Sequence, residues 1–199
     1  QLSEVFVQMR KGGGSVALRG AGCSYGDAST SNNGRVLDMT AMNRILSFDP
    51  QTGVAMCEPG VTVRDLWRGS ISSGYWPRVV SGTMAVTMGG AAAMNIHGKN
   101  NYALGSFGEG VRSFELMTPS GELVQCSREK EPELFHAAIS GFGMLGCFTK
   151  LEIQTKRVNS GRLRVSGIVA RDLEHNLEIL EDMCGEADYL VSWLDLHAK

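Results

Sequence analysis

A run of small residues that ends in a polar cluster constrains the fold of this chain most. Residues 81–100 read SGTMAVTMGGAAAMNIHGKN. Small side chains let backbone N–H groups come close to a ligand, and glycine also permits positive φ angles. The polar groups of His97, Lys99 and Asn100 follow an apolar run directly, so they must meet solvent, a ligand or partner groups. The run is typical either of a wall that holds a large flat ligand or of a tightly packed small-residue core.

Composition and charge exclude several classes of protein. The 199 residues are 43% hydrophobic and 20% charged, which is ordinary globular usage for one large or two small domains. The net charge of -2 gives no electrostatic footprint for nucleic acid. No apolar run approaches the ~20 residues that span a bilayer, so no transmembrane segment is predicted.

The cysteines indicate a reducing environment. They are odd in number, widely spaced and free of any CxxC pair, which favours free thiols over a disulfide or zinc framework. The five are Cys23, Cys57, Cys126, Cys147 and Cys184. We therefore predict no metal site and a cytoplasmic location, with peripheral attachment to a membrane left open.

A short apolar strand, residues 16–18, leads into the glycine-rich sequence RGAGCSYGD at residues 19–27. Gly20, Gly22 and Gly26 free the backbone to form a concave nest of N–H groups, which is an anion site by geometry. This loop is the first candidate for binding a phosphate group.

Two better-known phosphate motifs do not fit. A Rossmann fingerprint fails because Tyr25 stands at the third glycine and because residues 28–34 are too polar and turn-prone for the helix that must follow. A P-loop fails because Asn100, rather than Ser or Thr, follows Gly98 and Lys99.

Apolar periodicity and turn residues predict a mixture of helices and strands. Helices are expected over 2–9, 62–74, 132–139 and 173–184, and strands over 16–18, 36–39, 44–48, 54–57, 113–117, 122–126, 149–154, 163–170 and 189–196. The strands between residues 36 and 57 are expected to form a meander. A composition shift at 157–161 predicts a domain boundary, and the short piece beyond it is too small to sustain its own core.

Three segments together resemble a known family. RGAGCSYGD, the run at 81–100 and SGFGMLGCFTKLEI at 140–153 are similar to the FAD-binding domain of the p-cresol methylhydroxylase (PCMH) type, in the vanillyl-alcohol oxidase superfamily. Within it they look most like FAD-linked sugar and alditol oxidases such as decaprenylphosphoryl-β-D-ribose oxidase. The resemblance implies an α+β fold: a PCMH-type FAD-binding domain of two α/β subdomains over 1–157, then the incomplete start of an α+β substrate-covering domain over 158–199.

The resemblance also implies a set of site residues. The cofactor-binding set is Arg19, Gly20, Ala21, Gly22, Cys23, Ser24, Tyr25, Gly82, Thr83, Thr87, Met88, Gly89, Gly90, Met94, Ile96, His97, Gly146, Cys147 and Phe148. Tyr25, His97, Lys99 and Asn100 would contact substrate, and His97 and Lys99 would be catalytic. The alternatives are that the glycines only serve turns, that His97 is a structural hydrogen-bonding group and that Lys99 is merely solvated.

The family resemblance favours non-covalent FAD. Many members carry a histidine, bonded to the flavin, where this chain has Cys23, whereas the close relatives have arginine there and no link. An ionised Cys23 thiol could attack the flavin, but an unperturbed thiol has a pKa of ~8.5. We expect acid denaturation to release the flavin.

The implied function is that of an FAD-dependent oxidoreductase. It would oxidise an alcohol group of a sugar or polyol, including phosphorylated or lipid-linked ones, by hydride transfer to flavin N5, and would pass the electrons to oxygen or another acceptor. The partners are therefore the small-molecule substrate, the electron acceptor and the remainder of the substrate domain. No residue is a convincing base, so we expect these 199 residues to bind FAD better than they turn over substrate. The alternatives are a non-catalytic FAD- or nucleotide-binding module and a flavin reductase of the UDP-N-acetylenolpyruvoylglucosamine reductase type.

Overall fold

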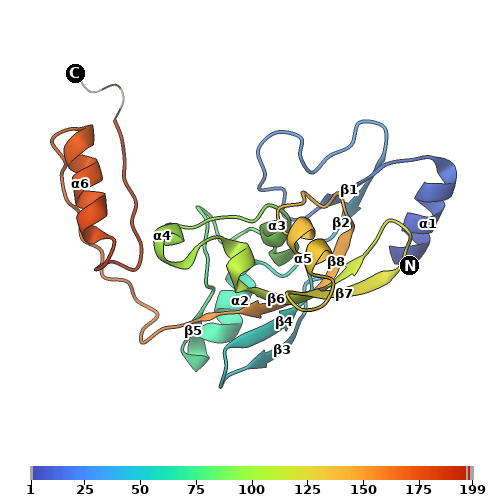
Figure 1. The fold of residues 1–199 in the computed structure, drawn as a ribbon, viewed down its shortest axis with the longest axis horizontal. Coiled ribbons are helices and arrows are strands. Elements are labelled where there is room, and N and C mark those ends of the chain that lie inside the picture. Colours follow the sequence, from blue (N-terminus) through green and yellow to red (C-terminus); the bar gives the residue numbers. More distant parts are fainter. Residues whose placement is uncertain (1, 196, 198–199) are drawn as a thin grey trace.

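The computed structural model describes residues 2–195 and 197, and the fold mixes helices and strands (Figure 1). The helices are α1 (Leu2–Gly12), α2 (Val63–Ser70), α3 (Met88–Ala93), α4 (Asn101–Leu104), α5 (Pro132–Ala138) and α6 (Leu173–Met183), with 3-10 turns η1 (Ile71–Ser73) and η2 (Phe107–Gly110). The strands are β1 (Val16–Arg19), β2 (Arg35–Asp38), β3 (Ile45–Asp49), β4 (Val54–Cys57), β5 (Tyr75–Trp76), β6 (Val111–Met117), β7 (Leu123–Ser127), β8 (Cys147–Gln154) and β9 (Lys156–Arg157). The predicted α+β class is confirmed.

A five-stranded antiparallel sheet in the order β3-β4-β8-β6-β7 carries the main core. Its central strand β8 pairs with β4 on one side and with β6 on the other. One face packs against α2, α3 and α5 through fully buried apolar side chains, among them Leu66 of α2, Met88 of α3 and Leu151 of β8. The other face carries polar side chains, among them Lys150 bonded to Glu115 across β6 and β8. At the end of β6 and the start of β8, a second small apolar cluster joins Met117 and Cys147 to Phe6 of α1 and to Met39. Along residues 149–154, buried side chains alternate with more exposed ones, as the sequence predicts.

Three phenylalanine rings hold α5 on this sheet. Phe114 of β6 stacks on Phe135 of α5, with ring centroids 5.2 Å apart and planes 11° apart. Its other neighbour is Phe148 of β8, at 4.8 Å and 79°. Such pairs add about 0.5–1.5 kcal/mol each beyond their area burial. Because Phe148 begins the strand that leaves a glycine turn, this cluster fixes the position of that turn.

Local sequence signals explain why α2 begins where it does. Thr62 is the N-cap: its hydroxyl oxygen accepts from the Asp65 amide, and the Asp65 carboxylate accepts from the Thr62 amide. This reciprocal pair satisfies two donors that a helix N-terminus otherwise leaves unpaired. The predicted N-cap at Thr62 is confirmed.

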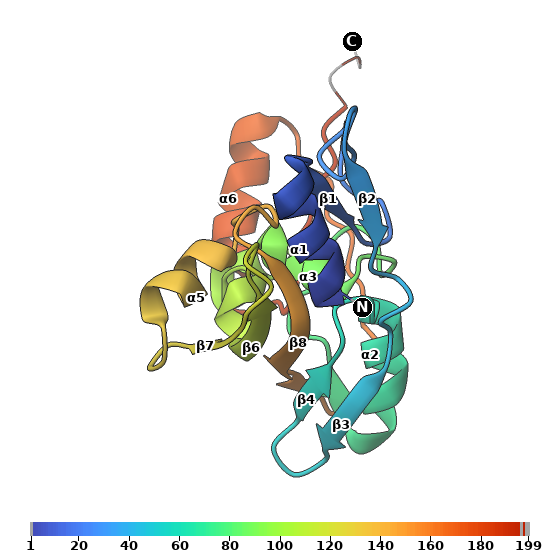
Figure 2. The same ribbon diagram turned by 90° about the vertical axis from the view of Figure 1, so that its right-hand side faces the viewer.

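The predicted meander is wrong in one strand. β2 pairs in parallel with β1 in a separate two-stranded sheet, while β3 and β4 form the expected antiparallel hairpin. The 15-residue connection between β1 and β2 carries the chain back to run in the same direction as β1, which a tight turn cannot do. Residues 20–34 are therefore a crossover loop beside α1 and above the main sheet (Figures 1 and 2).

Two predicted strands near the end of the chain do not form. Residues 163–170 and 189–195 are extended but pair with no described strand, whereas the predicted helix between them is present as α6. Val165 and Trp193 are 87% and 94% exposed, so no described neighbour buries their apolar side chains. The predicted end of the second strand, Leu196, lies outside the described residues.

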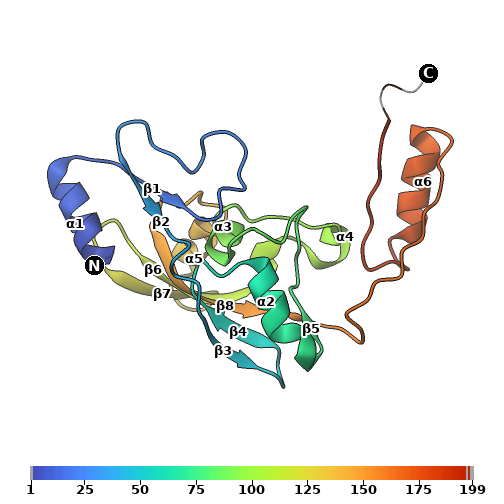
Figure 3. The ribbon, with the colours of Figure 1, turned by 180° about the vertical axis from the view of Figure 1, so that it is seen from behind.

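The segment beyond β9 stands apart from the sheet, on the side of α4 and opposite α1 (Figures 1 and 3). Its contacts with the rest of the chain include a hydrogen bond from the Leu190 amide to the Lys99 carbonyl, 2.8 Å long, and an ion pair between Lys156 and Asp188. The Tyr102 hydroxyl also donates to the Ala187 carbonyl. This geometry is compatible with the predicted boundary at residue 157, which stays a prediction.

Candidate functional site

A cavity of about 760 Å³ lies where three segments meet: the loop that follows β1 (residues 20–34, the β1 loop), α3, and the turn before β8 (residues 140–146). Its lining residues are Leu18, Gly20, Ala21, Gly22, Cys23, Ser24, Tyr25, Ala28, Ser29, Met39, Pro59, Ser81, Gly82, Thr83, Val86, Thr87, Gly89, Gly90, Ala93, Met94, Asn95, Ile96, His97, Phe142, Gly143, Gly146, Cys147 and Phe148. The two glycine-rich turns, far apart in sequence, therefore face one cavity together with His97.

The β1 loop has unpaired backbone amides close to the Arg19 guanidinium. Within the described residues, the backbone N–H groups of residues 20–24 donate no hydrogen bond. Gly22 has φ of 67°, and a Cβ there would lie 2.4 Å from Nη2 of Arg19, whose Nη1 donates to Ser29 Oγ at 3.1 Å. Unpaired amides in a tight turn beside a guanidinium form an anion site.

The carboxylate of Asp38 is engaged by Thr40 rather than by the loop. Asp38, at the end of β2, accepts from both the amide and the hydroxyl of Thr40, at 2.9 and 2.6 Å. The Thr40 bonds, with a smaller contribution from the charge of Arg19, lower the pKa of Asp38. The Asp38 carboxylate therefore stays ionised and accepts from Thr40, not from the amides of residues 20–24.

Close backbone contacts bring α3 against the loop. Thr87 is the N-cap of α3, and a Cβ on Gly20 would lie 2.3 Å from its Oγ1. The Gly89 amide donates to the Pro59 carbonyl at 2.8 Å, and a Cβ on Gly89 would lie 2.7 Å from Pro59 Cβ. Glycine is needed at both positions because any side chain would push the cavity walls apart.

The turn at residues 140–146 is tied to the other end of α3. The amides of Ser140 and Phe142 donate to the carbonyls of Ala92 and Ala93, at 3.1 and 3.0 Å. Both donors have positive φ, 69° and 56°, which is uncommon outside glycine and typical of functional or tightly determined turns. These bonds tie the turn to the last carbonyls of α3, of which the Ala92 carbonyl also accepts from the Asn95 amide.

Comparisons with known proteins agree with this geometry. The family described as "FAD binding domain" matches residues 1–127. The chain belongs to this FAD-binding family. The resemblance to the PCMH type is thereby confirmed, and the cofactor is FAD.

Three relatives show the range of the family. The chain is 36% identical over 192 residues to decaprenylphosphoryl-beta-D-ribose oxidase of Mycolicibacterium smegmatis, covering 95% of this chain and 42% of the relative. It is 31% identical to cytokinin dehydrogenase 6 of Oryza sativa subsp. japonica, covering 92% and 37%. It is 29% identical to the mitochondrial L-galactono-1,4-lactone dehydrogenase of Arabidopsis thaliana, covering 68% and 22%. The chain thus spans about two fifths or less of the length of these curated relatives.

The cavity suits an FAD molecule on its own chemistry. The unpaired amides of residues 20–24 and the Arg19 guanidinium match a diphosphate. A Cβ on Gly82 would meet nothing within 4 Å, so the wall there leaves open space. Within the described residues, no cluster of His, Cys, Asp or Glu could hold a metal ion, and no helix is both long and apolar enough to cross a membrane.

Most of the predicted cofactor set lines the cavity, and the structure places the rest elsewhere. Met88 is fully buried in the core between α3 and the sheet. Arg19 lies under the loop rather than on the cavity wall. Cys147 lines the cavity, but burial raises the pKa of its thiol to about 12, so it stays neutral. The cofactor-binding roles remain predictions for each residue.

The predicted substrate residues divide into two groups. Tyr25 and His97 line the cavity, and Tyr25 is fully exposed. Asn100 does not line it: its side chain is buried, and Nδ2 donates to the Arg78 carbonyl at 2.9 Å. Lys99 is exposed and also absent from the lining. The structure therefore brings His97 and Tyr25 together with the cofactor cavity, and does not bring Lys99 and Asn100 there.

Sequence reasoning missed several lining residues. They are Leu18, Ala28, Ser29, Met39, Pro59, Ser81, Val86, Ala93, Asn95, Phe142 and Gly143. Asn95 lies in the run at residues 81–100 and Phe142 in the segment at 140–153, so membership of these two motifs is the sequence signal that could have identified them. Met39 and Pro59 follow other strands, and only the tertiary fold brings them to the cavity.

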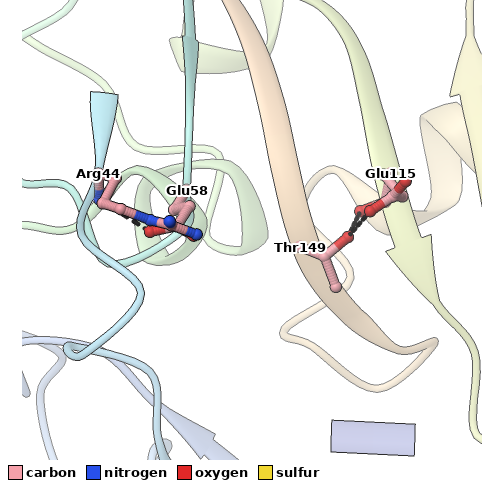
Figure 4. A network of polar contacts seen from close by, with 4 residues as sticks. All are labelled: Arg44, Glu58, Glu115 and Thr149. Atoms are coloured by element: carbon pink, nitrogen blue, oxygen red, sulfur yellow. Dashed lines mark hydrogen bonds and ion pairs between the residues drawn. The ribbon is translucent and has the colours of Figure 1, made fainter. Parts of the chain in front are cut away.

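A largely buried carboxylate, that of Glu58, directly precedes the cavity-lining Pro59 and pairs with Arg44 (Figure 4). Glu58 accepts from the Arg44 Nη2, Nε and backbone amide, at 2.6, 3.1 and 2.8 Å. The hydrogen bonds from the Arg44 guanidinium lower the pKa of Glu58. Burial opposes this shift, and the bond from the Arg44 amide adds to it. The figure also shows the hydrogen bond that the Thr149 hydroxyl donates to the Glu115 carboxylate. This bond is 2.5 Å long and adds a side-chain contact to the backbone pairing of β6 and β8.

We expect Glu58→Gln to remove a pH-dependent part of the stability. Because the folded pKa is lowered, the Glu58 contribution is present above the unfolded value of ~4.3 and is lost as pH falls through the folded value. At pH 7 the loss should lie between the ~0.5 kcal/mol of an exposed pair and the ~3 kcal/mol of a buried one, since Arg44 is mostly exposed. Urea unfolding at several pH values checks this, with the exposed Glu186→Gln as control; equal losses in both variants at pH 7 would contradict it.

Proposed function

We propose that this chain is the cofactor-binding part of an FAD-dependent oxidoreductase that oxidises an alcohol group of a sugar or polyol, including phosphorylated or lipid-linked ones. The observation that carries the proposal is that His97 lines the same cavity as both glycine-rich turns. The ribose oxidase and lactone dehydrogenase names of two relatives support a sugar-like substrate. A substrate of the cytokinin type is the second candidate, since cytokinin dehydrogenase 6 is 31% identical over nearly the whole chain.

The residues of the chain have distinct tasks in this proposal. The amides of residues 20–24, with Arg19 close behind them, would hold the diphosphate, and the small residues of α3 would leave room for the flat rings. His97 orients the hydroxyl of the substrate, whereas Lys99 lies outside the cavity lining and has no assigned contact in it. Bound FAD would supply the acceptor for the hydride that leaves the alcohol carbon, and the hydroxyl proton would leave to solvent. FAD is held non-covalently, since Cys23 replaces the histidine that carries the link in other members, and the five free thiols support a cytoplasmic location.

The test is anaerobic bleaching of the flavin band at ~450 nm by a panel of sugars, polyols and cytokinins. We expect a sugar or polyol to bleach the wild-type chain, and His97→Ala to slow this bleaching about 100-fold, the order of effect of a positioned polar group. His136→Ala is the matched control, because His136 is exposed on α5 and outside the cavity.

The outcomes separate the candidate functions. Bleaching by cytokinins alone would replace the sugar assignment by the second candidate. Bleaching by NADPH and by no member of the panel would indicate a flavin reductase. A flavin that none of these compounds reduces would contradict the proposal and favour a binding module.

A further inference from the structure

Asn95 has an unusual backbone at the point where α3 ends. Its φ is 44°, one of four positive values among the described residues other than glycine. Asparagine tolerates this left-handed region better than most side chains. The Asn95 amide still donates to the Ala92 carbonyl at 3.1 Å, which closes the last turn of the helix. The chain therefore leaves α3 in a direction that Asn95 determines.

The side chain of Asn95 joins this exit to η2. Its Oδ1 accepts from the Gly108 amide at 2.8 Å, and the next carbonyl, that of Ile96, accepts from the Phe107 amide at 2.8 Å. The Ile96 amide is also engaged, with the Ala91 carbonyl at 3.1 Å. Phe107 is 5% exposed, so η2 is anchored in the core. Two parallel bonds thus hold residues 95 and 96 against a fixed element.

The contact between Asn95 and Gly108 of η2 leaves little free space. A Cβ on Gly108 would lie 2.7 Å from Ile139 Cγ2 and 3.0 Å from Asn95 Oδ1. The η2 turn is therefore pressed between α3's exit and the segment after α5, with no room to shift toward Asn95.

His97, which follows directly, has no such support of its own. Its side chain is exposed on the cavity wall and makes no hydrogen bond with any described residue. The position of the His97 ring therefore depends on the backbone of Asn95 and Ile96, which precede it. Displacing a positioned group by about 1 Å can cost up to ~100-fold in rate.

We propose that Asn95 is a positioning residue: its bond to the Gly108 amide sets the direction in which His97 enters the cofactor cavity. The functional consequence rests on the proposed role of His97, whereas the positioning itself does not.

The experiment uses the FAD-bound chain and two substitutions. Asn95→Gly retains the positive φ at little cost and removes the acceptor, while Asn95→Asp retains an acceptor. The readout is the set of histidine ring C–H signals in the NMR spectrum, with His97 assigned as the signal that His97→Ala removes. We expect Asn95→Gly to move or broaden the His97 signal alone and Asn95→Asp to restore it. Asn159→Gly, in the exposed linker, should change none.

A second experiment measures how Asn95→Gly changes the rate of flavin reduction by substrate. The probe is whichever sugar or polyol bleaches the wild-type flavin fastest. Asn95→Gly should slow this reduction about tenfold in the wild-type background and not at all beyond His97→Ala, because two residues that act through one group are not additive. A full tenfold loss in the His97→Ala background would overturn the proposal.

The NMR result decides independently of the substrate. An unchanged His97 signal in Asn95→Gly, or equal movement of all histidine signals, would overturn the positioning role. A moved His97 signal together with normal flavin reduction in His97→Ala would uphold the positioning role and instead remove the function proposed for His97.

Discussion

Gly22→Ala should raise the dissociation constant for FAD about 30-fold. The added Cβ would lie 2.4 Å from the Arg19 Nη2, so the guanidinium must move away from the loop and from Ser29. Moving the guanidinium away weakens its attraction for a diphosphate bound by the loop amides. A loss of about 2 kcal/mol, the order of one charge-assisted interaction, converts to roughly that factor. Titration of the protein into FAD, followed by flavin fluorescence, measures the change.

Gly26→Ala is the matched control for this prediction. Gly26 lies in the same loop with nearly the same φ, 65° against 67°, but a Cβ there would meet nothing within 4 Å. Both variants carry similar backbone strain, in the free and in the bound protein alike, so strain alone should leave the dissociation constant nearly unchanged. Equal dissociation constants in the two variants would show that Arg19 contributes nothing to the diphosphate site.

Sequence patterns predicted the elements whose signals are local. The capping residues of α2 at Thr62, the hairpin of β6 and β7 and the alternation of β8 are set by neighbours a few residues away, and all three are present. The glycine spacing of the β1 loop likewise predicted an anion nest, because a nest depends only on consecutive backbone angles.

Long-range pairing and side-chain direction were beyond these patterns. Nothing near β2 indicates that it pairs in parallel with β1 across 15 residues, since register is decided by burial in the whole fold. Adjacency in sequence also placed Asn100 beside His97, yet its amide turns inward to the Arg78 carbonyl and is buried. A polar residue after an apolar run can satisfy its hydrogen bonds inside the core as well as at a site.

Phe114→Ala should give the largest loss of stability. Phe114 is 1% exposed and contacts the rings of both Phe135 and Phe148, so the substitution leaves a cavity that α5 and β8 cannot close without losing their own contacts. Such truncations cost about 3–5 kcal/mol, and for a chain of this size that lowers the melting temperature by ~10 °C. Thermal unfolding of the FAD-free protein measures it, and Leu123→Ala, on the neighbouring strand with a 55% exposed side chain, should lie within ~0.5 kcal/mol of wild type.

Phe114→Ala should also lower the affinity of the protein for FAD. Phe148 lines the cavity and loses its ring partner in Phe114→Ala, so the wall at the start of β8 loosens and the affinity for FAD falls. Saturating FAD stabilises only the folded state, and a weaker affinity reduces that stabilisation at a given FAD concentration. The gap in melting temperature between wild type and Phe114→Ala should therefore widen when FAD is added. A gap that stays constant would mean that the aromatic cluster holds α5 on the sheet without shaping the cavity.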